Sequence, residues 1–169
     1  MAGNDVQEKT SGDHVQFRFA DRDDVTAIVA LLADDQLGAG RESVAPVDEK
    51  GEVDNPYLTA FEHMAAQGFN KYLLAVDAQG ELLGCLQLTL IAGLSRAGMT
   101  RAQIEGVRVA SHARGQRIGQ KLFAEAHDVA RREGCGLVQL TTDRVRADAL
   151  RFYEQLGYEN THNGMKLTL

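Results

Sequence analysis

Arginine and glycine are interspersed in residues 113–122, which read ARGQRIGQKL and lead directly into a predicted helix. A helix N-terminus exposes unpaired backbone N–H groups and carries roughly half a positive charge from its aligned peptide dipoles. Gly115 and Gly119 have no side chain to obstruct a ligand, and Arg114 and Arg117 add full positive charges. Two interpretations follow: an anion cradle for a phosphorylated ligand, or an ordinary strand-to-helix turn with solvated arginines. The stretch is neither a Walker motif nor a dinucleotide fingerprint, because Gly-Lys-Ser/Thr and GxGxxG are missing from it.

Two further side chains have types that suit acid–base chemistry. Glu105 lies among apolar residues of a predicted strand, where a carboxylate is costly unless it has a partner or faces a wet cleft. It is either a base for an amine, which is mostly protonated at neutral pH, or an edge or salt-bridged glutamate. Tyr153 shares helical spacing with Ala149, Phe152 and Leu156. By that pattern alone it is typical of a core tyrosine with a satisfied hydroxyl.

The elements that position these residues follow from the spacing of apolar side chains. Strands are predicted over 14–20, 71–78, 81–93, 101–110 and 137–143, with one or two short strands around Asn163-Gly164. Helices are predicted after Asp21 or Asp23, from Pro56 to about Gln67, from the RGQRIG turn to about Arg132, and over 147–157. The long helix carries an apolar stripe of Ile118, Leu122, Ala126, Val129 and Ala130. The nearly continuous apolar run 137–143 predicts an internal strand.

This order, β-α-α-β-β-β-α-β-α-β, predicts a single α/β domain over 14–169, with a mixed sheet and helices on both faces. The strands on either side of the long helix are expected to be parallel neighbours. Residues 1–13 are polar and are predicted to be a disordered start without the apolar stretch of a signal peptide.

The composition excludes several classes of function. The formal net charge of −6 and the absence of Trp argue against a nucleic-acid binder, so any anion site must be local. Cys85 and Cys135 lie in apolar segments and are read as reduced thiols of a cytoplasmic protein. The five histidines lack metal-ligand spacing, so no metal is expected. No apolar run is long enough for a membrane span.

The stretch IEGVRVASHARGQRIGQKL resembles the cofactor motif of the GNAT superfamily of N-acetyltransferases, Arg/Gln-x-x-Gly-x-Gly/Ala, here Arg114 to Gly119. Arg117 replaces the first motif glycine, and in helical geometry it is expected still to supply its backbone N–H. ADALRFYEQLGYE resembles a second motif of that family, A-x-x-x-Tyr-x-x-x-Gly-Phe/Tyr. The two motifs occur at family-like spacing.

The resemblance implies acetyl-CoA as cosubstrate and no metal. It implies that the pantetheine arm lies along the backbone of Val107, Arg108 and Val109. It implies that the pyrophosphate is bound by Arg114, Gly115, Gln116, Arg117, Ile118, Gly119 and Gln120. Tyr153 becomes the candidate acid for the CoA thiolate. Glu105 matches the strand glutamate that acts as base in polyamine acetyltransferases of this superfamily.

The acceptor is expected to be a small primary amine, with a protein amine as the alternative. Residues 141–162 resemble aminoalkylphosphonate N-acetyltransferases, which implies an anionic acceptor, whereas segment 34–54 carries seven acids against two bases and favours a cation. Asp143 is read as a helix cap or a substrate contact, and His162 as an exposed turn residue or a substrate contact. A non-catalytic acyl-CoA sensor remains open, and a homodimer is an expected assembly because dimers are common among relatives.

Overall fold

The computed structural model describes residues 15–34 and 56–169, and it confirms the predicted mixed α/β fold. The prediction for residues 1–13 and most of the acidic segment 34–54 lie outside the described residues. Five strands form one sheet in the order β1-β2-β3-β4-β5. Their bounds are β1 Gln16–Phe19, β2 Asn70–Val76, β3 Leu82–Ile91, β4 Arg101–Val109 and β5 Leu137–Leu140. Only the last pair, β4 with β5, is parallel, as predicted for strands joined through the long helix.

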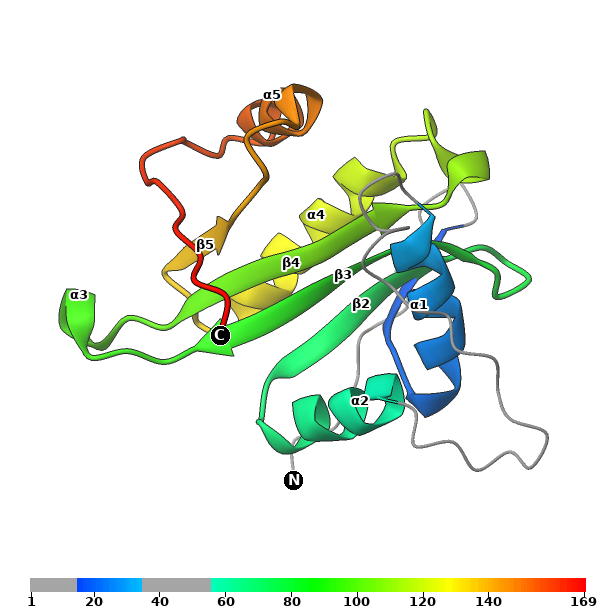
Figure 1. Ribbon diagram of the computed structural model, residues 1–169, viewed down its shortest axis with the longest axis horizontal. Coiled ribbons are helices and arrows are strands. Elements are labelled where there is room, and N and C mark those ends of the chain that lie inside the picture. The colour runs from blue at the N-terminus through cyan, green and yellow to red at the C-terminus, as the bar shows by residue number, and fades with distance from the viewer. Residues whose placement is uncertain (1–14, 35–55) are drawn as a thin grey trace.

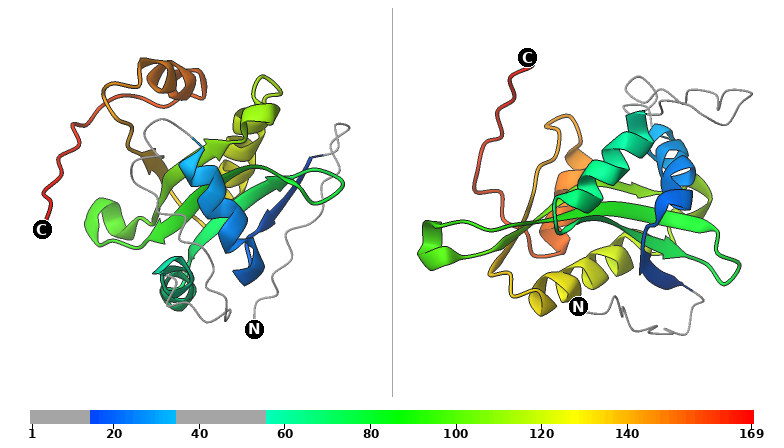
Figure 2. Two further views of the ribbon diagram at one scale, coloured as in Figure 1. Left: turned by 45° about the vertical axis from the view of Figure 1, so that its right-hand side comes forward. Right: turned by 90° about the horizontal axis from the view of Figure 1, so that it is seen from below.

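Helices cover both faces of the sheet (Figures 1 and 2). One face is covered by α4 (Ile118–Arg132), and α1 (Val25–Ala33) and α2 (Pro56–Ala66) lie on the other. The helix α5 (Ala147–Gln155) follows β5, and the short turn α3 (Ser95–Gly98) connects β3 with β4. Two single 3₁₀ turns, η1 (Arg22–Asp24) and η2 (Ser111–Ala113), precede α1 and α4.

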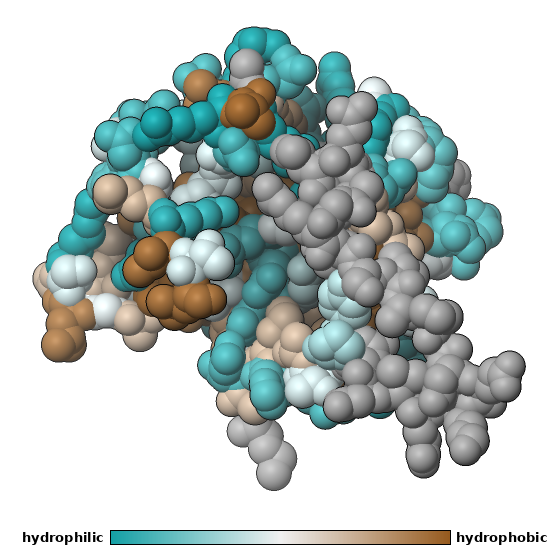
Figure 3. All heavy atoms as spheres, viewed as in Figure 1, coloured by the Kyte–Doolittle hydropathy of each residue, from teal (hydrophilic) through white to brown (hydrophobic). Residues whose placement is uncertain are grey.

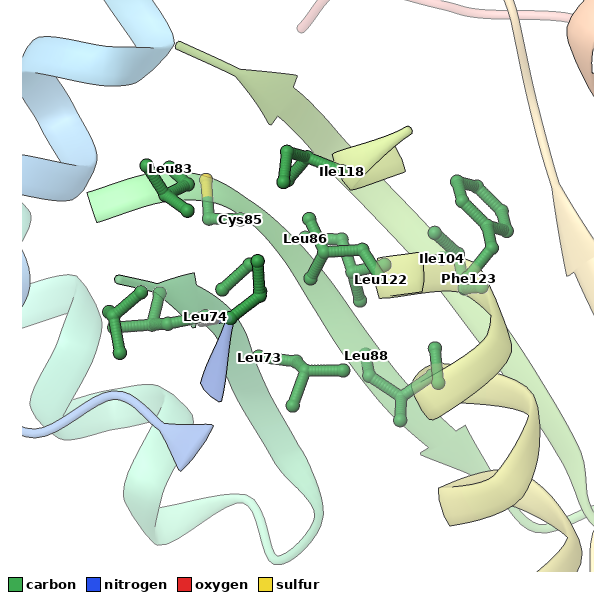
Figure 4. Packing of buried hydrophobic residues seen from close by; sticks show 14 of the residues in the cluster. Leu73, Leu74, Leu83, Cys85, Leu86, Leu88, Ile104, Ile118, Leu122 and Phe123 are labelled. Carbon is green, nitrogen blue, oxygen red and sulfur yellow. The ribbon is translucent and has the colours of Figure 1, made fainter. Parts of the chain in front are cut away.

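The apolar stripe of α4 makes the main core contact with the sheet. All five predicted positions are buried, and Phe123 joins them. Figure 4 shows Ile118, Leu122 and Phe123 packed near Leu86 and Ile104 of the middle strands. Burial of such side chains supplies the main drive for the helix to dock, because each apolar side chain of this size contributes about 1.5–3 kcal/mol when fully buried.

The strand β4 is irregular at its middle, where its pairing with β3 shifts register. Cys85 pairs with Arg108 and Gln87 pairs with Glu105, so three steps along β4 oppose two along β3. The extra residue is a β-bulge at Gly106, whose φ of +58° is readily adopted only by glycine. The pairing of β4 with β5 ends at Ile104. Beyond Ile104 the two strands diverge, and the edge of β4 that faces β5 is open.

Two sequence predictions were wrong: the short final strands around Asn163-Gly164, and the internal position of the strand at 137–143. Residues 158–169 form no strand, although Met165, Leu167 and Leu169 alternate in the way that predicts one. A strand requires a partner backbone as well as alternation, and these three side chains are almost fully exposed. Consequently β5 has β4 as its one neighbour in the described sheet, and it is a half-buried edge strand instead of an internal one.

Candidate functional site

The divergence of β4 from β5 opens a pocket of about 420 Å³. One wall is the open edge of β4, the second is the turn that leads into α4, and the third is α5. The lining residues are Val107, Arg108, Val109, Ala113, Arg114, Gly115, Arg117, Ile118, Gly119, Gln120, Arg146, Ala149, Phe152 and Tyr153. The site therefore joins the two separate sequence motifs across a gap between two parallel strands.

The turn wall presents backbone donors at the start of α4. Gly115 has a φ of +80° and open space where a side chain would begin, so a ligand can approach its backbone closely. Gln116 donates from Nε2 to the carbonyl oxygen of His112 over 3.1 Å, and its side chain closes the turn instead of lining the pocket. Arg114 lies 4.0 Å from the carboxylate of Asp34 and is exposed.

The expectation of helical geometry at Arg117 was wrong. Arg117 is the residue before α4 and has φ +61° and ψ +19°, the left-handed conformation. Left-handed backbone is the region in which glycine is favoured, since an L side chain clashes with the following carbonyl. The position where the resembled motif has glycine is thus occupied by a strained arginine, and this residue is part of the pocket lining.

Four arginines surround the pocket, from three different elements: Arg108 in β4, Arg114 and Arg117 in the turn, and Arg146 directly before α5. The pocket is thereby locally cationic in a chain of net charge −6. Such a setting attracts an anionic ligand into one place without making the whole surface basic.

The wall formed by α5 carries Tyr153 in an aromatic cluster with α4. Its ring lies 5.6 Å from that of Phe123 and 6.1 Å from that of Tyr158. Burial raises the pKa of the Tyr153 hydroxyl, and the positive charges of Arg146 and Arg108 oppose that rise. A neutral phenol in this position can donate a proton.

Tyr158 and His127 anchor the far side of that cluster. His127 Nε2 and the Tyr158 hydroxyl oxygen are 2.8 Å apart, which fixes the chain three residues beyond the end of α5 against α4. Burial lowers the pKa of His127, so the neutral imidazole is the favoured partner. The pair holds α5, and with it Tyr153, at the pocket.

Gly119 serves packing as well as access. A Cβ at this position would lie 3.3 Å from Phe152 Cζ and 3.7 Å from Val109 Cγ2. The absence of a side chain at Gly119 therefore lets α5 approach the start of α4. Sequence reasoning had assigned this glycine to ligand access alone.

Of the predicted cofactor residues, the structure brings all except Gln116 to the pocket lining, together with Tyr153. Glu105 lies outside the lining. It precedes the bulge, is exposed, and is paired with Gln87 on the sheet face that carries α1 and α2. The two candidate acid–base residues are therefore on different sides of the open edge of β4.

Sequence reasoning missed Arg146, Ala113, Ala149 and Phe152 as lining residues. A signal for Arg146 existed, because it is a cation directly before a helix that carries a motif residue. No sequence signal marked Phe152 as a lining residue, because its spacing with Ala149 and Leu156 also fits ordinary core packing.

Two other candidates are placed away from the lining. Asp143 accepts a bond from Val145 N, and Arg146 N donates to the Asp143 carbonyl oxygen over 3.0 Å, so this residue shapes the turn before α5. His162 is exposed, with its ring nitrogen beside the Thr161 hydroxyl.

Across residues 15–34 and 56–169, no cluster of His, Cys, Asp or Glu could hold a metal ion. Within the same ranges, no helix combines the length and the apolar character that crossing a membrane requires.

Comparison with known proteins identifies the class. The model of the acetyltransferase (GNAT) family matches residues 39–158, and the chain belongs to that family. An aminoalkylphosphonate N-acetyltransferase of Salmonella typhimurium is 37% identical over 91 residues, a match that covers 54% of this chain and 58% of that protein.

Solved structures give the same fold. A protein described as a transcriptional regulator from Bacillus halodurans superimposes with a TM-score of 0.85 at 42% identity, covering 92% of this chain and all of that one. A predicted acetyltransferase with acetyl-CoA from Clostridium acetobutylicum has a TM-score of 0.67 at 14% identity, covering 91% and 96% of the two chains. At that identity the likeness shows the fold alone.

Proposed function

We propose that this protein transfers the acetyl group of acetyl-CoA to a primary amine of a small molecule, by direct attack in a ternary complex. The observation that carries the proposal is the pocket where the open edge of β4, the arginine-bearing turn and Tyr153 meet. An acetyl-CoA-bound protein of the same fold supports the choice of cosubstrate.

The chain's own residues suit the binding of a diphosphate-linked thioester. Backbone N–H groups of the turn and the start of α4, with Arg114 and Arg117, suit the diphosphate. The extended backbone of Val107 to Val109 faces the pocket without a β5 partner, so it can bond to the amide groups of the arm as a further strand would.

Starting from the neutral amine, the proposed reaction needs one proton removed from nitrogen and one supplied to sulfur. The amine nitrogen attacks the thioester carbonyl carbon, the new C–N bond forms, and the C–S bond breaks. A backbone N–H near Val107 stabilises the charge on the carbonyl oxygen. Glu105 takes the amine proton, directly or through water, and the Tyr153 hydroxyl gives a proton to the departing thiolate.

The relatives support a small amine as acceptor, since the Salmonella relative is named for an aminoalkylphosphonate. An acetyltransferase that acts on a protein amine is the alternative within the same chemistry. The name of the 42% identical Bacillus halodurans protein favours a second candidate, a regulator that binds acetyl-CoA without turnover. A cytoplasmic location stays a prediction.

The substitution Tyr153→Phe tests the acid. Because the hydroxyl would be lost while the ring and its packing remain, kcat for an accepted amine is expected to fall about a hundredfold, the usual range for a general acid. The Kd for acetyl-CoA is expected to change less than about twofold, since the phenol is assigned to the leaving thiolate. Thiol release and titration calorimetry measure the two quantities.

Tyr158→Phe is the comparison variant, because it removes the hydroxyl that bonds His127 and so loosens the same aromatic cluster without removing a pocket-lining group. Equal loss in both variants would mean that the cluster's packing, and not the acid, was disturbed. Tight acetyl-CoA binding without turnover of any amine would support the regulator instead.

A further inference from the structure

One half of the sheet face that carries α1 and α2 is lined by polar side chains in two rows. Strand pairing aligns Tyr72, Gln87 and Glu105 across β2, β3 and β4. The next row aligns Asn70, Thr89, Gln103 and Gln139 across β2 to β5. We call these seven residues the polar floor. In Figure 3, which views this side of the molecule, hydrophilic atoms lie over the middle strands.

Alternation along the strands fixes the direction of the floor. A Cβ on Gly84 would meet Leu122 and Ile118 of α4, so the neighbours that alternate with Gly84, among them Gln87, point to the opposite face. A Cβ on Gly106 would meet Tyr72 and Leu32 of α1, which places Tyr72 on the α1 side. The floor is therefore on the face away from α4.

Hydrogen bonds join the floor residues in two groups, one around Asn70 and one between Gln139 and Gln103. Asn70 Oδ1 accepts from Gln87 Nε2 over 2.8 Å and from Thr89 Oγ1 over 3.1 Å. Gln139 Nε2 donates to Gln103 Oε1 over 2.7 Å. A carboxamide has two N–H donors and a carbonyl with two lone pairs, so these bonds orient the side chains and leave capacity for a ligand.

The composition of the floor differs from that of a solvated sheet face. The exposed surface of such a face is usually rich in Lys, Arg, Asp and Glu. Six of the seven floor residues are uncharged and half-buried, and Glu105 is the one that is exposed and charged. The cations of this face stand in the flanking rows, with the Arg101 guanidinium beside Gly93 and Arg108 bonded to the Val107 carbonyl oxygen.

The floor lies beside the proposed cosubstrate site. Glu105 is in its first row and is two residues before Val107, which lines the pocket. If an acceptor amine reaches the thioester from the side of Glu105, the rest of the acceptor molecule lies over Gln87 and over the second row of the floor.

We propose that the polar floor is the acceptor subsite and that it selects an uncharged, polyhydroxylated primary amine, an amino sugar by chemical class, over an amine that carries an anion. This inference rests on the proposed function. Hydroxyl groups pair with amide donors and acceptors at several points, whereas an anionic group over these rows meets Glu105 and finds no cation within them.

The test compares two primary amines, glucosamine and 2-aminoethylphosphonate, by thiol release from acetyl-CoA. We expect kcat/KM for glucosamine to exceed that for 2-aminoethylphosphonate at least about tenfold. Gln87→Met keeps the size of the side chain and removes its amide, and it is expected to raise the KM for glucosamine about tenfold while the KM for acetyl-CoA stays within about twofold. Thr89→Val should act in the same direction.

Gln79→Met is the matched control, because Gln79 is exposed in the turn between β2 and β3 and is not in the floor. It should leave both KM values unchanged, and melting curves exclude unfolding of any variant. A preference for 2-aminoethylphosphonate, turnover of neither amine, or an unchanged KM in both floor variants would overturn the inference. Acetyl-CoA titration of the same samples distinguishes failure of this inference from failure of the proposed function. Loss of acetyl-CoA binding would contradict the proposed function itself.

Discussion

At the scale of single residues, Arg117 combines backbone strain with a charge at the pocket. Its left-handed conformation costs an L residue about 1–2 kcal/mol relative to ordinary backbone. Such outliers cluster at functional sites. Arg96 and Ala97 in the α3 turn are also left-handed, but of the three it is Arg117 that lines the pocket. Arg117 thus lowers the stability of the fold at a position where, under the proposed function, its charge would face the diphosphate of acetyl-CoA.

Arg117→Gly is therefore expected to stabilise the fold and weaken cofactor binding. The free energy of unfolding should rise by up to about 1 kcal/mol, because strain is relieved while the unfolded glycine gains freedom that offsets part of the gain. Urea denaturation measures this, and calorimetry should show weaker acetyl-CoA binding.

Arg117→Ala separates the two effects, since it removes the charge and keeps the strain. It should bind acetyl-CoA as weakly as the glycine variant but be less stable than it. Equal stability of the two variants would contradict the strain argument.

At the scale of elements, the contact of β3 with β4 and α4 depends on Gly84. A Cβ at this position would lie 2.9 Å from the Arg108 carbonyl oxygen and 3.0 Å from Leu122 Cδ1. The first contact is with backbone of the strand that forms the pocket wall, and backbone in a sheet cannot move without breaking its pairing.

Gly84→Ala is expected to lower the free energy of unfolding by about 1–3 kcal/mol, the usual cost of overpacking a core. Chemical denaturation checks this value. Gly93→Ala is the control, because its nearest contact is the end of the Arg101 side chain at 3.5 Å and its change in stability should stay within about 0.5 kcal/mol. A neutral Gly84→Ala would mean that α4 and β4 separate more easily than their packing indicates.

At the scale of the whole molecule, the charge is divided between an acidic chain and a pocket ringed by four arginines. Attraction between exposed charges is screened by salt, and the Debye length falls from about 10 Å at 0.1 M to about 3 Å at 1 M. The Kd for acetyl-CoA is therefore expected to rise about tenfold between 0.05 and 0.5 M NaCl.

Arg146→Gln should reduce the slope of log Kd against log salt, because Arg146 lines the pocket. Lys166→Gln removes a charge from the exposed C-terminal segment and should leave the slope unchanged. A slope that does not respond to Arg146→Gln would remove this residue from the binding site.

The sequence by itself determined the local elements and the two motifs. The long helix was predictable because five apolar residues at helical spacing can be buried together on one side, and β2, β3 and β4 were predictable from alternating or continuous apolar runs bounded by turn residues. The residues from Val107 to Gln120 were found in sequence because they are contiguous, and a contiguous motif needs no tertiary information.

Only the tertiary structure decided which distant residues share the pocket and the floor. Arg146 and Phe152 reach the pocket because β4 and β5 part beyond Ile104, and the floor exists because strand registers align residues from four strands. The missing final strand has the same origin, because a strand needs a partner backbone. Each depends on the chain's packing against segments far away in sequence, and periodicity along one segment carries no information about them.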